Sequence, residues 1–135
     1  MKLLLNIDVP DLERAASFYS AAFGLTESRR LGKEVLELSG SAVSIFLLLK
    51  AEGSFPFVHA ASQRTYQRHW CPLHFDVVVD DMEAAIDRVL EAGAVQEQPV
   101  STYAWGRMAV FADPFGHGFC LVQFLGRGYA EIEST

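Results

Sequence analysis

The residues best suited to chemistry in this sequence are a histidine and an aspartate two positions apart. His74 and Asp76 lie in a short, mostly apolar stretch, residues 74–79. Because side chains alternate between the two faces of a strand, both should point to the same face. An imidazole beside a carboxylate can act as an acid/base pair near neutral pH, so His74 and Asp76 are our catalytic candidates. The alternative is a structural histidine that is hydrogen-bonded to a neighbouring backbone group.

A second group of candidates lies in a long segment between two patterned stretches, residues 51–72. From residue 53 to its end this segment contains no Asp or Glu, and it interleaves arginines with aromatic residues. Ordered connections of this length are commonly lids or binding loops, so Tyr66, Arg68 and Trp70 are predicted to close over a cavity. Arg68 would then pair with a negative charge on the ligand. Alternatively, the aromatic residues pack on a sheet and the arginines pair with surface acids.

The elements that position these residues form an internal repeat with an offset of 70 residues. A short apolar stretch, an aspartate and an amphipathic run occur near the start of the chain and again 70 residues later. Apolar residues in both runs recur with the spacing of one helical face. Asp11 and Asp81 precede the runs as N-caps, while Gly24 and Gly93 follow them as C-caps.

Each helical run is followed by three short strand-like stretches with turn residues between them. This order predicts two tandem βαβββ modules in an α+β fold, with curled mixed sheets around a cavity and the helices on the outer face. The strands after the helices are expected at residues 26–31, 34–38, 42–49, 95–103, 107–112 and 118–124. The expected divisions of this single domain are module one at about 2–50, a connector at 51–72, module two at 73–125 and a short tail at 126–135.

Composition limits the classes of partner. The chain has 135 residues, the size of one domain, and a formal net charge of −6. An acidic protein lacks the basic footprint that nucleic acids and anionic membranes require, so neither is an expected partner. Two cysteines without a CxxC motif cannot form a disulfide framework. We therefore expect a reduced, cytoplasmic protein.

The two modules, the Phe18-Tyr19 pair in the first helix and an Asp-Pro-Phe-Gly turn at residues 113–116 together resemble the vicinal oxygen chelate superfamily. This superfamily includes glyoxalase I, extradiol dioxygenases, methylmalonyl-CoA epimerase, and the bleomycin- and fosfomycin-resistance proteins. The resemblance covers residues 3 to about 124. It implies the fold above and a site on the sheets, and says little about the substrate.

The resemblance also implies where a metal would bind in the metal-dependent members. The corresponding positions are Leu4, Ser44, His74 and Cys120, and Ser44 and Cys120 each follow a glycine by four residues. His74 alone is a usual ligand type at its position, while Leu4 has no donor atom and Cys120 stands where the family uses glutamate. We therefore expect no metal and no other cofactor. A divalent metal held by His74 and Cys120 is the alternative.

These observations predict a small-molecule-binding protein of this superfamily without the usual metal triad. The ligand is expected to be small and aromatic or anionic. The alternatives are a glyoxalase-like lyase or isomerase that uses an atypical His74/Cys120 site, and an antibiotic-sequestering resistance protein. A homodimer is expected, because open sheet edges favour association. The predicted ligand-binding residues are Asn6, Phe46, Tyr66, Arg68, Trp70, His74, Asp76, Trp105, Arg107 and Cys120.

Overall fold

The computed structural model describes residues 1–134 and divides the chain into two compact units. The boundary lies between Gln67 and Arg68, inside the expected connector. Most of the connector thus belongs with the first module, and its last residues belong with the second. Each unit is described by itself.

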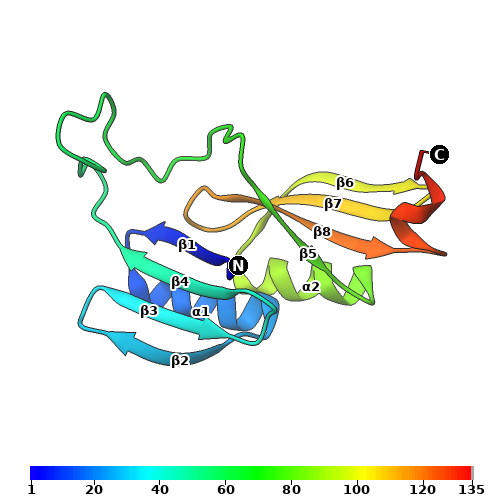
Figure 1. The fold of residues 1–135 in the computed structure, drawn as a ribbon, viewed down its shortest axis with the longest axis horizontal. Coiled ribbons are helices and arrows are strands. Elements are labelled where there is room, and N and C mark those ends of the chain that lie inside the picture. The colour runs from blue at the N-terminus through cyan, green and yellow to red at the C-terminus, as the bar shows by residue number, and fades with distance from the viewer. Residues whose placement is uncertain (135) are drawn as a thin grey trace. The chain divides into compact units, whose positions relative to one another are not determined.

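The first unit is a four-stranded mixed sheet with one helix against it (Figure 1). The strand order is β1-β4-β3-β2, in which β1 and β4 are parallel and the other neighbours are antiparallel. A parallel pair needs a crossover connection, and the helix that follows β1 begins it. The elements are β1 (Leu4–Val9), α1 (Leu12–Phe23), β2 (Thr26–Leu31), β3 (Val35–Ser39) and β4 (Ser44–Leu49).

The second unit repeats this topology. Its strand order is β5-β8-β7-β6, and again the first pair is parallel and the others are antiparallel. The predicted α+β fold with two tandem βαβββ modules is therefore confirmed. The elements are β5 (Phe75–Val78), α2 (Met82–Ala92), β6 (Val95–Tyr103), β7 (Gly106–Ala112), β8 (Gly118–Phe124) and a 3₁₀ helix, η1 (Gly128–Glu131).

Both helices begin and end at the predicted caps. The Asp11 carboxylate accepts a hydrogen bond from the backbone N–H of Arg14 at 3.0 Å, at the start of α1. The Asp81 carboxylate does the same for the N–H of Ala84 at 3.0 Å. The glycines after the helices adopt positive φ angles, +68° at Gly24 and +113° at Gly93, a region that glycine enters at little cost.

Replacing either capping aspartate with alanine should lower the free energy of unfolding by about 1 kcal/mol, because one backbone N–H of the first turn loses its partner. Urea denaturation would measure the loss. Asp87→Ala is the matched control, since Asp87 is an exposed aspartate inside α2 and caps nothing. A control loss as large as that of Asp81→Ala would contradict the capping role.

Each unit has its own apolar core between the helix and one face of the sheet. In the second unit Phe111 of β7 and Phe119 of β8 are fully buried and stack at 5.5 Å. Met82 and Val89 of α2 are also fully buried. Since side chains alternate along each strand, the residues between the core positions point to the opposite face of the sheet. His74, Asp76 and Cys120 belong to that opposite face.

The turn between β7 and β8 is built around a buried carboxylate. The side chain of Asp113 is 0% exposed, and its Oδ1 accepts hydrogen bonds from the backbone N–H groups of Phe115 (2.8 Å) and His117 (2.9 Å). Its Oδ2 lies 2.7 Å from Nδ1 of His117. Gly116 completes the turn at a φ of +86°. His117 therefore supports the turn. The turn fixes where β8 begins, and hence the position of Cys120 on that strand.

Candidate ligand and metal site

Three chemically active side chains gather on the second sheet. β5 and β8 are parallel, and their register places Asp76 directly beside Cys120. His74 lies two residues before Asp76, immediately ahead of β5. Ligating atoms of His74, Asp76 and Cys120 all lie within 4.8 Å of one another, and His74 Nε2 is 3.4 Å from Asp76 Oδ1. The predicted pair of His74 and Asp76 is thus extended by a thiol.

The electrostatics of this cluster keep the thiol protonated. Cys120 is 7% exposed, whereas His74 and Asp76 are exposed. Burial, together with the charge of Asp76 and a hydrogen bond to it, raises the pKa of Cys120 to about 11. The nucleophilic form of cysteine is the thiolate, so Cys120 in this state is a poor nucleophile at neutral pH. The arrangement suits polar recognition, acid/base chemistry at His74 and Asp76, or the holding of a cation.

The first sheet carries no equivalent set at the matching positions. In the parallel pair of β1 and β4, Leu4 lies beside Ser44 and Asn6 lies beside Phe46. Asn6 matches Asp76 in the repeat, so Phe46 is the counterpart of Cys120. Glycine spacing had made Ser44 the counterpart of Cys120, and the strand register corrects this assignment. The stretch from Gly40 to Phe46 is longer than the matching stretch from Gly116 to Cys120. Leu4 and Phe46 have no donor atom for a metal.

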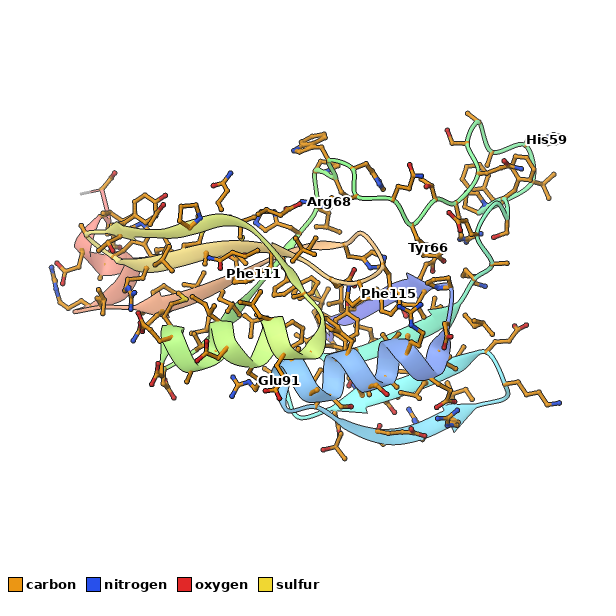
Figure 2. The ribbon with its side chains drawn as sticks, turned by 180° about the vertical axis from the view of Figure 1, so that it is seen from behind. His59, Tyr66, Arg68, Glu91, Phe111 and Phe115 are labelled. Carbon is orange, nitrogen blue, oxygen red and sulfur yellow. The ribbon has the colours of Figure 1, made fainter. Side chains whose placement is uncertain are left out.

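The structure places Arg68 in an ion pair on the second sheet, and its contact with an anionic ligand stays a prediction. Its guanidinium pairs with Glu97 through two hydrogen bonds, of 2.8 and 3.0 Å, and also donates to the carbonyl of His69. Figure 2 shows Arg68 on the side of the second sheet opposite α2. A Cβ on Gly118 would lie 2.6 Å from Nη2 of Arg68, so glycine leaves the room that the guanidinium occupies. Arg68 thus holds the end of the connector on this sheet face, with its charge already neutralised.

The other two lid candidates lie in different surroundings. The hydroxyl of Tyr66, which is labelled in Figure 2, donates to the carbonyl of Lys50 at 2.6 Å. Nearby in the chain, Arg64 forms an ion pair with Asp8 at 2.7 Å, and both contacts lie inside the first unit. Trp70 belongs to the second unit and is 81% exposed. Tyr66 therefore belongs to the first unit, whereas Arg68 and Trp70 belong to the second, and the lid stays a prediction.

The two candidates at the β6–β7 hairpin have structural partners. Trp105 stacks on Tyr103 with ring centres 5.2 Å apart, and also contacts Tyr129 near the end of the chain. Arg107 forms hydrogen bonds of 2.5 and 3.1 Å with the carboxylate of Glu83 in the first turn of α2. A half-buried arginine that is already paired has little charge left for a ligand, so we leave Arg107 out of the proposed site.

Sequence reasoning missed three features of this region. Asp76 was predicted for acid/base chemistry and not as a donor in one cluster with Cys120. That role depends on the β5–β8 register, which the sequence pattern does not specify. Glu97, the partner of Arg68, lies where the β6–β7 register shifts. Gly118 carries no signal in the sequence, because its role is to leave space for a side chain from a distant segment.

Comparisons with known proteins agree with the fold. Residues 5–122 match a family model described as a glyoxalase-like domain. An uncharacterized protein of Mycobacterium bovis is 30% identical over 121 residues, which cover 87% of this chain and 80% of that protein. An uncharacterized protein of Mycobacterium tuberculosis H37Rv is 30% identical over 121 residues, with 87% and 71% covered.

Solved structures with lower identity share the architecture. A hypothetical protein from S. aureus has a TM-score of 0.71 at 23% identity, covering 91% of this chain and 93% of that one. The fosfomycin resistance protein FosX from Listeria monocytogenes has a TM-score of 0.69 at 18% identity, with 93% of both chains covered. Lactoylglutathione lyase from Agrobacterium tumefaciens has a TM-score of 0.60 at 15% identity, covering 91% and 94%. The repeated module and the family match, which spans most of the sequence, show that this chain belongs to the glyoxalase-like domain family, within the vicinal oxygen chelate superfamily.

Proposed function

We propose that this protein binds a small aromatic molecule on the face of the second sheet that carries His74, Asp76 and Cys120. The observation behind this proposal is the convergence of these three polar groups within 4.8 Å on the sheet face opposite α2. A few convergent polar groups among apolar side chains are typical of small-molecule sites. Buried Val122, two residues beyond Cys120, supplies an apolar neighbour on the same face.

The aromatic class is favoured over the anionic one. Arg68, the cation expected to meet a negative charge, is paired with Glu97, and Arg107, another predicted ligand-binding residue, is paired with Glu83. An anionic ligand would have to displace Glu97 or Glu83 and would meet the carboxylate of Asp76. A neutral aromatic ligand with a hydroxyl group could hydrogen-bond to Asp76 or His74 without that repulsion.

Ligand-observed NMR with a panel of small aromatic alcohols and the matching aromatic carboxylates would test this proposal, in buffer containing a chelator. We expect the alcohols to bind more tightly, and Asp76→Ala to weaken them about tenfold, which corresponds to about 1.4 kcal/mol. Asp87→Ala, which changes an exposed aspartate on α2, is the control and should bind as the wild type does. The proposal fails if no alcohol binds, or if Asp76→Ala binds the alcohols as tightly as the control.

A lyase or isomerase of the glyoxalase type is the second candidate, since Asp76 adds a third donor to the predicted His74/Cys120 pair. An antibiotic-sequestering protein remains a third possibility, and the likeness to FosX shows the fold alone. The homodimer, the cytoplasmic location and the lack of nucleic-acid partners remain predictions. Among the residues that the structure describes, no helix is long and apolar enough to cross a membrane.

A further inference from the structure

We propose that His74, Asp76 and Cys120 form a binding site for a thiophilic divalent cation, Zn²⁺ above all, that is complete within the second module. This inference goes beyond the proposed function, because it requires no organic ligand. It also differs from the arrangement that the resemblance implies. In that arrangement both modules supply ligands. Here all three donors belong to the second module: Asp76 lies on β5, His74 immediately precedes β5, and Cys120 lies on β8.

The donor set has the chemistry of a zinc site. Zinc is bound by thiolate, imidazole and carboxylate groups, and a catalytic type of site uses three protein ligands and one open position. In a tetrahedral site neighbouring ligand atoms lie about 3.4–3.6 Å apart, as follows from the usual zinc–ligand lengths. His74 Nε2 and Asp76 Oδ1 are already 3.4 Å apart, and the whole set fits within 4.8 Å. The exposed imidazole of His74 can rotate to close the remaining gap.

The surroundings favour a fixed thiol and mobile outer ligands. Cys120 is buried on the central strand β8, between β5 and β7, so its position is set by the sheet. His74 and Asp76 are exposed and leave the fourth position open to water. Arg68, a cation on this face of the sheet, is neutralised by Glu97. Its repulsion of an incoming cation is thereby reduced.

The thiolate determines which metals the site prefers. Thiolate and imidazole favour zinc and its thiophilic analogues, whereas Mg²⁺ and Mn²⁺ prefer oxygen ligands. The expected order of affinity is therefore Zn²⁺ and Cd²⁺ far above Mg²⁺. At position 120 the family uses glutamate, whereas this chain has cysteine. This difference would shift the metal preference of the site from cations that favour oxygen ligands to thiophilic cations.

Titration of the full chain with Co²⁺ and Cd²⁺ would test the site directly, because both metals give charge-transfer absorption when a thiolate binds them. We expect one metal per chain with a thiolate band, which Zn²⁺ removes from the Co²⁺-loaded protein and which excess Mg²⁺ leaves unchanged for both metals. Cys120→Ser should abolish the band. Asp76→Asn and His74→Gln should each weaken metal binding at least about tenfold. Mutation of residues that only support metal ligands already costs about that much affinity, so loss of a ligand should cost no less.

The control is Cys71→Ser, which removes the exposed cysteine of the same unit and should leave the band unchanged. Circular dichroism of each variant would establish that the fold is intact. The site is refuted if the band is lost in Cys71→Ser and kept in Cys120→Ser, if no metal binds stoichiometrically, or if Mg²⁺ displaces Cd²⁺. Ligand binding is measured in chelator and metal binding without organic ligand, so failure of one proposal does not entail failure of the other.

Discussion

Replacing Asp113 with alanine is expected to lower the free energy of unfolding by about 3 kcal/mol, which is a large share of the stability of a domain of this size. The carboxylate is fully buried and accepts hydrogen bonds from two backbone N–H groups of the turn between β7 and β8. Alanine would leave both N–H groups and the ring of His117 without this acceptor, and buried donors without partners are costly. Urea denaturation monitored by circular dichroism would measure the loss.

Asp113→Asn separates the hydrogen bonds from the charge. Asparagine keeps an oxygen at the position that receives the two backbone N–H groups, so we expect a loss of about 1 kcal/mol. If the alanine and asparagine variants lose the same stability, the backbone hydrogen bonds are not the source of the effect. A loss below about 1 kcal/mol in the alanine variant would mean that the turn holds its shape without the carboxylate.

The fold could be predicted from the sequence because its signals are local and occur twice. Aspartate before an amphipathic run and glycine after it mark helix ends in any context, and an offset of 70 residues repeats both markers. The strands at residues 95–103 and 118–124 match their predicted bounds. The order of strands within each sheet was not predicted, because local pattern does not determine which strands pair.

The site was only partly predictable, because its contacts depend on register and on distant partners. Alternation along β5 places His74 and Asp76 on one face from sequence alone. The closeness of Cys120 depends on the β5–β8 register, and the pairing of Arg68 depends on Glu97, 29 residues away. Residues 53–72 around Arg68 contain no acidic residue, which favoured an unpaired arginine, yet Glu97 on β6 neutralises it.

In protein freed of metal by a chelator, Cys120 is expected to react with iodoacetamide about a hundredfold more slowly than an ordinary cysteine at pH 7.5, since the rate follows the thiolate fraction. Burial, the charge of Asp76 and the hydrogen bond to it raise the pKa of this thiol from 9.0 to about 11. Cys71 is exposed and supplies an internal control within the same chain. Mass spectrometry of the two alkylated peptides would give both rates from one sample.

The pH dependence and one variant distinguish the cause of this slow reaction. With a pKa of about 11, the rate at Cys120 should keep rising with pH through 10, and a plateau below pH 9 would contradict the shift. Asp76→Asn removes the negative charge next to the thiol, so it should speed alkylation of Cys120 and leave Cys71 unchanged. Because the raised pKa favours the protonated thiol in the folded state, its stabilising contribution is complete below pH 9 and is lost as the pH rises from 9 to 11. An Asp76→Asn variant that reacts as slowly as the wild type would show that burial alone protects Cys120.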